Sequence, residues 1–194
     1  MMTTVDLWQR HAMAIEDVTQ CFLRVTAAFD TARIPYALVG GQAVALWVAT
    51  EDPDAIRITK DVDILVRRDD LPAVRKAGLS IGMDYFEVMG VGMLLERDNP
   101  NPRRGVHFIW AGEKVRPENP LASPSIETIE RLDSGRPVVP LIGLVQMKLM
   151  ANRDQDRVHL RDMIGVDLIS REMLPSLLPE FAARLDALLT ESGR

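Results

Sequence analysis

A short apolar run that ends in two glycines limits the folds that this chain can adopt. Residues 36–39 read Tyr-Ala-Leu-Val and precede Gly40 and Gly41, and residues 42–49 then carry apolar positions at helical spacing. An apolar run bounded by glycine is typical of a buried strand, and glycine permits backbone turns that other residues resist. The segment therefore predicts a compact unit in which a strand, a glycine turn and a helix follow one another.

The first 35 residues predict a long amphipathic helix. Apolar residues recur at steps of three, four or seven and so fall on one face of a helix. These residues are Trp8, His11, Ile15, Val18, Phe22, Val25 and Phe29. The helix should end at Arg33-Ile34-Pro35, because the residue before a proline avoids the helical region.

The remaining chain predicts an α/β fold with a helical carboxy-terminal third. Strands are predicted at 61–66, 85–89, 92–96 and 106–110, a hairpin turn at 133–135, loops at 50–60 and 117–124, and helices at 73–77, 141–152, 157–169 and 176–191. The helix at 73–77 should start from an aspartate cap at residues 69–70 and close at Gly78. We therefore expect a mixed sheet with flanking helices in residues 1–140, and a helical extension, residues 141–194, packed on it.

Composition excludes several classes of protein. The 23 Lys and Arg residues against 28 Asp and Glu give a net charge of −5, the wrong sign for a protein that coats duplex DNA. The single cysteine, Cys21, excludes a disulfide framework and a multi-cysteine zinc site. Residues 1–17 lack the basic start and apolar run of a signal peptide, and no segment approaches the length of a membrane helix. We therefore expect a cytoplasmic protein that does not bind membranes.

Two acids lie two residues apart in the predicted strand at 61–66. Residues two apart on a strand point to the same face, so Asp61 and Asp63 should converge. Carboxylates held together repel unless a cation lies between them, and Mg²⁺ binds one or two protein carboxylates plus water and phosphate oxygens. The upstream glycines would let backbone N–H groups approach a phosphate. Taken separately, an acidic strand is usually a solvated edge and a glycine pair is usually a simple turn.

Together these residues resemble a known family. Gly40-Gly41-Gln42-Ala43 followed by Thr59-Lys60-Asp61-Val62-Asp63 looks like the nucleotidyltransferase superfamily related to DNA polymerase beta, and in particular its abortive-infection and toxin–antitoxin branch. Residues 147–151, Arg153 and residues 159–163 are similar to a helical motif of that branch. The resemblance spans about residues 36–169 and implies a nucleotidyltransferase-like fold.

The resemblance also implies roles for single residues. Gly40, Gly41 and Thr59 would bind the nucleotide, Asp61 and Asp63 would hold Mg²⁺ or Mn²⁺, and Lys148 would lie near the triphosphate. An ammonium group suits a leaving pyrophosphate, which gains negative charge as the bond breaks. The alternative for Lys148 is an ordinary solvated lysine on an amphipathic helix. Asp162 matches a polar position of the same branch without a defined role.

One position departs from the family pattern. The stretch Val106-His107-Phe108-Ile109-Trp110-Ala111-Gly112-Glu113 places His107 where a third acid is expected. Replacing a carboxylate by a neutral imidazole removes one negative charge from the site, and imidazole binds softer metals better than Mg²⁺. An imidazole can also act as a base near neutral pH. The alternative is a packed or exposed strand histidine. Glu96, on the preceding predicted strand, is a candidate substitute acid.

The function expected from these features is transfer of a nucleoside monophosphate from a nucleoside triphosphate to a hydroxyl of RNA, protein or a small molecule, with release of pyrophosphate. A toxin–antitoxin role would add an antitoxin partner. The alternative is a nucleotide-binding pseudoenzyme or interaction protein that lost turnover because of His107. Arg153, Arg157 and Arg161 recur every four residues as a basic stripe that could meet RNA, but the acids between them favour an ion-paired surface. Arg103 and Arg104 are either phosphate contacts or solvated.

Overall fold

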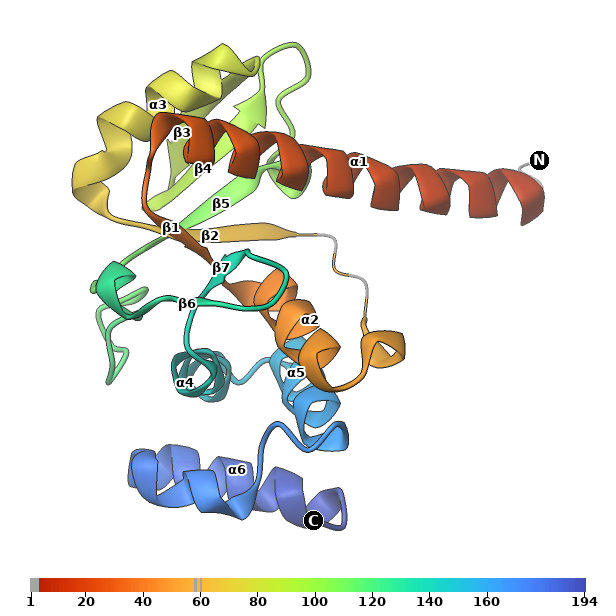
Figure 1. Cartoon of the computed structure of the whole chain (residues 1–194), viewed down its shortest axis with the longest axis vertical. Coiled ribbons are helices and arrows are strands. Elements are labelled where there is room, and N and C mark those ends of the chain that lie inside the picture. Colours follow the sequence, from red (N-terminus) through yellow and green to blue (C-terminus); the bar gives the residue numbers. More distant parts are fainter. Residues whose placement is uncertain (1–3, 58, 60) are drawn as a thin grey trace.

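A computed structural model describes residues 4–57, 59 and 61–194 of the chain. Its elements are a seven-stranded sheet, six α-helices and short 3-10 turns (Figure 1). The predicted apolar positions Trp8, His11 and Ile15 lie on the first helix, but their side chains are outside the described part, as are residues 58 and 60 of the predicted loop. Within the described part, no helix is both long and apolar enough to cross a membrane.

The sheet is mixed in direction and has the strand order β3-β4-β5-β2-β1-β7-β6. The strands are β1 (Tyr36–Leu38), β2 (Val62–Val66), β3 (Met83–Val88), β4 (Val91–Glu96), β5 (Val106–Trp110), β6 (Glu130–Arg131) and β7 (Pro137–Val138). Strand β2 lies between β1, which is antiparallel to it, and β5, which is parallel to it. The predicted α/β fold class and its mixed sheet are confirmed.

The helices cover both faces of the sheet. They are α1 (Thr4–Ala32), α2 (Gly40–Glu51), α3 (Leu71–Ser80), α4 (Leu141–Ala151), α5 (Asp154–Gly165) and α6 (Pro179–Glu191). Helices α1 and α3 lie on one face, α2, α4 and α5 lie on the other, and α6 packs on α4 and α5 (Figure 1). Residues of the carboxy-terminal helices, among them Leu144, Leu160 and Phe181, share one apolar core with Val44 of α2 and Ala37 of β1.

Alternation along the central strands divides their side chains between two cores. In β2, Ile64 packs with α1 and α3, whereas Leu65 packs with α2, α4 and α5. Both side chains are fully buried, and each such burial contributes about 1.5–3 kcal/mol. If β2 shifted by one residue against its neighbours, every side chain of the strand would move to the opposite face of the sheet. Because both faces are buried, the packing fixes the register. The same parity puts Asp63 on the face of Leu65.

Several local predictions need correction. Helix α3 does not close at Gly78 but continues to Ser80, and Gly78 packs so closely on β4 that a Cβ there would lie 2.6 Å from Leu94. Asp70 does not cap α3 with its side chain, because its carboxylate accepts a hydrogen bond from Arg67 at 2.8 Å. Helix α5 starts at Asp154, three residues before the predicted start at Arg157.

Candidate active site

The glycine turn lies directly against the carboxylate of Asp63. Gly40 has a φ of +64°, and a Cβ added to it would lie only 2.2 Å from Oδ2 of Asp63. The backbone N–H of Val39 donates to the carbonyl oxygen of Asp63 at 3.2 Å, which holds the end of β1 to the start of β2. No side chain caps the amino terminus of α2 at Val39. Glycine is therefore required at residue 40, both for its backbone angle and for the close approach of Asp63.

Gly41 is in similarly close contact with Thr59. A Cβ on Gly41 would lie 2.5 Å from Oγ1 of Thr59, whose side chain is buried. The N–H of Asp61 points toward the same hydroxyl oxygen at 3.5 Å. The structure thus brings together Gly40, Gly41, Thr59 and Asp63, residues separated by up to 23 positions in the sequence.

The two acids of the Asp-x-Asp pattern have different environments. Asp61 is exposed and precedes β2, which begins at Val62, whereas the Asp63 side chain is 29% exposed. Burial raises the pKa of the Asp63 carboxyl above its usual range; the charge of His107 opposes this rise and the negative charge of Asp61 adds to it. Two carboxylates that repel in a partly buried site are a setting in which a cation is favourable.

His107 lies beside Asp63 in the sheet. Strands β2 and β5 are parallel, with Asp63 paired to His107 in register, so both side chains lie on one face. Nδ1 of His107 is 3.9 Å from Oδ1 of Asp63, and the His107 side chain is 24% exposed. This separation is too long for a hydrogen bond, so Asp63 does not fix the imidazole.

Glu96 is not placed to substitute for the missing acid. It pairs with Met83 across the β3–β4 ladder, and Met83 belongs to the core beneath α1 and α3. Its carboxylate forms an ion pair with Arg24 of α1. Strand alternation therefore puts Glu96 on the sheet face opposite Asp63, which the sequence pattern alone did not reveal.

Lys148 is buried in a network of charged groups. Its Nζ donates to Oδ1 of Asp156 at 3.0 Å, and the two side chains are only 7% and 1% exposed. Nε of Arg153 donates to Oδ2 of Asp156 at 2.8 Å. Burial disfavours the Asp156 carboxylate, but the hydrogen bond from Arg153 and the charge of Lys148 outweigh it and lower its pKa. The solvated-lysine alternative for Lys148 is wrong, and the sequence pattern did not show its contact with Asp156.

The remaining polar residues of α5 form other contacts. Asp162 accepts two hydrogen bonds from Arg57, at 2.8 and 2.9 Å, and so ties α5 to the segment that precedes Thr59. His159 is buried, and its Nδ1 has no hydrogen-bond partner among the described residues. Burial, followed by the charge of Lys148, lowers the pKa of His159 to about 4.

The basic residues outside this network are mostly ion-paired. Arg157 pairs with Asp154 and Arg161 with Glu191, both along a groove of about 550 Å³ between α5 and α6. Arg153 precedes α5 and turns toward Asp156, so the three arginines do not form one stripe. In the loop before β5, Arg104 pairs with Asp17 of α1 at 3.3 Å. The pairs Arg153–Asp156 and Arg157–Asp154 match the ion-paired interpretation of the sequence. Arg161 pairs instead with an acid of α6, and Arg104 is ion-paired with α1 rather than simply solvated.

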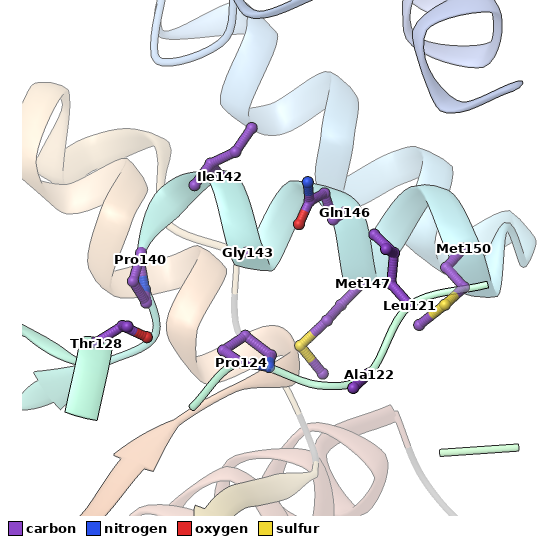
Figure 2. Close-up of a pocket in the computed structure, with 10 residues that line it drawn as sticks. All are labelled: Leu121, Ala122, Pro124, Thr128, Pro140, Ile142, Gly143, Gln146, Met147 and Met150. Carbon is purple, nitrogen blue, oxygen red and sulfur yellow. The ribbon is translucent and has the colours of Figure 1, made fainter. Parts of the chain in front are cut away.

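A separate pocket of about 270 Å³ lies between α4 and the segment that leads to β6 (Figure 2). Its walls are mainly apolar, and Figure 2 shows Met147 of α4 facing Pro124. The lining residues are Leu121, Ala122, Pro124, Thr128, Pro140, Ile142, Gly143, Gln146, Met147 and Met150. None of them is a predicted site residue.

The donor set around Asp63 fits a hard divalent cation that is only partly bound by protein. Among the described residues, no group of three or more His, Cys, Asp or Glu side chains is arranged to hold a metal ion. Mg²⁺ commonly uses one or two carboxylates and completes its shell with water and substrate phosphates. Asp63 beside the bare bend at Gly40, with Asp61 next to it, matches that mode of binding.

The sheet, its flanking helices and the helical carboxy-terminal region together form a polymerase-beta-like nucleotidyltransferase fold. The solution structure of the antibiotic-resistance factor ANT(2'')-Ia has this fold, with a TM-score of 0.51 and 15% identity over 91% of this chain and 94% of that chain. At this identity the likeness establishes the fold alone. No protein-family model matches the sequence, and a search of curated proteins found no match.

Two further structures are similar at lower scores. A crystal structure of ANT(2'')-Ia in complex with adenylyl-2''-tobramycin has a TM-score of 0.48 at 14% identity, over 91% of this chain and 99% of that chain. The Megavirus polyadenylate synthase has a TM-score of 0.44 at 10% identity, over 82% of this chain and 36% of that chain.

Proposed function

We propose that the chain transfers a nucleoside monophosphate from a nucleoside triphosphate to a hydroxyl acceptor and releases pyrophosphate. The observation that carries this proposal is the contact of the bare bend at Gly40 with the carboxylate of Asp63. The charges of Lys148 and Arg153 act on that same carboxylate. A triphosphate is bound by three kinds of group: an acid that can hold a metal cation, a backbone surface without side chains, and positively charged side chains. All three are found here.

Each predicted site residue has a role in this reaction. Asp61 and Asp63 would hold Mg²⁺ or Mn²⁺, which neutralises charge on the phosphates when bound. Gly40, Gly41 and Thr59 would line the phosphate path, and Lys148 would face the leaving pyrophosphate. The acceptor oxygen forms a bond to the α-phosphorus, the bond from that phosphorus to the pyrophosphate oxygen breaks, and the hydroxyl proton passes to a base. The protein contributes position and charge.

His107 is the group we assign to the proton. Its imidazole lies beside Asp63 on the site face and is partly open to solvent, so an acceptor hydroxyl can reach it. An imidazole accepts a proton near neutral pH, which a carboxylate bound to a metal does less readily. His107 would therefore replace the third acid in part, as a base.

The acceptor classes that we propose are RNA, a protein hydroxyl and a small molecule. The fold neighbour ANT(2'')-Ia is an antibiotic-resistance factor, which supports including antibiotics among the small molecules to be tested. A toxin–antitoxin role, with an antitoxin partner that restrains the chain in the cytoplasm, belongs to the same proposal. Residues 1–140 would carry the site, and residues 141–194 would form the wall that supplies Lys148.

The test is label transfer from each α-labelled nucleoside triphosphate in the presence of Mg²⁺ or Mn²⁺. Total RNA, a protein extract and a panel of antibiotics serve as acceptors. Asp61→Asn should abolish transfer, because it removes one metal-binding carboxylate. Asp54→Asn is the matched control, since Asp54 is an exposed acid in the 3-10 turn that precedes this segment. Loss of transfer in both variants, or in neither, would contradict the assignment of Asp61.

The presence of His107 at the third position favours a second candidate, a nucleotide-binding pseudoenzyme or interaction protein. It predicts that a triphosphate binds and raises the thermal midpoint of unfolding, while no label moves to any acceptor with either metal. Transfer that depends on Asp61 would exclude this candidate.

A further inference from the structure

We propose that Asp156 is a positioning residue that directs Lys148 and Arg153 toward the triphosphate. This inference deepens the proposed function and rests on it. Asp156 is a buried acid whose carboxylate accepts hydrogen bonds from two cationic side chains, those of Lys148 and Arg153. It belongs to neither the Asp-x-Asp pattern nor the glycine turn.

The geometry joins three groups into one unit. Oδ1 of Asp156 accepts from Nζ of Lys148 at 3.0 Å, and Oδ2 accepts from Nε of Arg153 at 2.8 Å. Oδ2 also accepts from the backbone N–H of Arg153 at 3.2 Å, so the same carboxylate caps the amino terminus of α5. Lys148 on α4 and Arg153 before α5 are therefore fixed relative to each other by one side chain.

The two cations lie within electrostatic reach of the acids of the candidate site. The positive charges of Lys148 and Arg153 both act on Asp63, and the charge of Arg153 is also felt by Asp61. Lys148 has three N–H donors, and its contact with Asp156 uses one of them. The Arg153 side chain is 74% exposed and is thus accessible to a ligand. Donors remain on both cations for the oxygens of a phosphate chain.

A buried ammonium needs a buried partner, because its desolvation is costly without one. Asp156 meets this need at 1% exposure, where no water competes for its oxygens. The same carboxylate also holds the side chain of Arg153, an exposed arginine whose charge acts on Asp63. Asp156 acts through Lys148 and Arg153, so its removal should weaken triphosphate binding more than metal binding.

The experiment compares Asp156→Asn with Asp154→Asn, an exposed acid in the first turn of the same helix that pairs with Arg157. Binding of a non-hydrolysable triphosphate is measured by calorimetry, binding of Mn²⁺ alone by electron paramagnetic resonance, and folding by thermal unfolding. We expect Asp156→Asn to weaken triphosphate binding by about 10–100-fold, as for other residues that orient a ligand-binding group, while Mn²⁺ affinity changes by less than about threefold. Asp154→Asn should change neither affinity.

A purely structural role of Asp156 predicts a different result. If Asp156→Asn binds the triphosphate as the unaltered chain does, or loses triphosphate and Mn²⁺ binding equally, the inference is wrong. If Asp156→Asn does not fold, the double variant Lys148→Met with Asp156→Leu replaces the buried ion pair by apolar groups, a change that proteins often tolerate. That variant must fold and bind the triphosphate weakly; unchanged affinity would refute the inference. Failure of the unaltered chain to bind any triphosphate would refute the proposed function itself.

Discussion

Replacing Gly40 by alanine tests the contact on which the candidate site depends. The new Cβ would be built 2.2 Å from Oδ2 of Asp63, so the carboxylate has to move. The left-handed backbone angle at residue 40 costs about 1–2 kcal/mol for alanine. An off-rotamer Asp63 adds about 0.5–1.5 kcal/mol. We therefore expect the free energy of unfolding to fall by about 1.5–3.5 kcal/mol.

Gly112→Ala provides the matched control for this experiment. Gly112 has a φ of +72°, close to that of Gly40, but a Cβ there would meet nothing within 4 Å. Its cost should be the backbone cost alone, about 1–2 kcal/mol, with no effect on the site. The difference between the two variants therefore isolates the displacement of Asp63.

The assays are urea unfolding for stability, and Mn²⁺ and triphosphate binding for the site. A shift of Asp63 by about 1 Å should reduce nucleotidyl transfer by about 100-fold. Gly40→Ala should lose Mn²⁺ affinity, and Gly112→Ala should retain it. Normal Mn²⁺ binding by Gly40→Ala, with no greater loss of stability than in Gly112→Ala, would show that Gly40 does not control the position of Asp63.

Three further predictions concern single side chains. His107→Asp should strengthen Mg²⁺ binding, measured by calorimetry, because it adds a carboxylate beside Asp63; an unchanged affinity would place residue 107 outside the metal site. Because the pKa of His159 falls to about 4 from its ordinary 6.5, the unfolded chain takes up the proton first, and stability should drop as pH falls from about 6.5 to about 4. The loss should reach about 2 kcal/mol at pH 5 in urea unfolding, and His159→Leu should lack this part of the pH dependence. Glu96→Gln should leave metal binding and transfer unchanged, since Glu96 pairs with Arg24 on the other face of the sheet; a loss of either would contradict that placement.

The sequence predicted the central elements because their signals are local. Alternation in residues 61–66 and the glycine pair determine a strand and a turn whatever packs on them. The sequence could not show that Lys148 is buried, because that depends on Asp156 reaching it from the next helix. It could not orient Glu96 either, since the parity of β4 is set by pairing with β3 and β5. Likewise, Gly78 lies inside α3 and does not end it, because the close packing of Leu94 of β4 leaves no room for a side chain at residue 78.

The parallel pairing of β2 with β5 has a consequence for how such a protein can change over time. Residue 107 is presented next to Asp63 because Val106 and Phe108, on either side of it, are anchored in the apolar core. The position of β5 is therefore set by these two apolar side chains and not by the side chain of residue 107. Aspartate and histidine codons differ by one base, so a single mutation can exchange acid and imidazole here while the rest of the molecule stays folded. The residue that we propose as the base can therefore be exchanged without rebuilding the architecture.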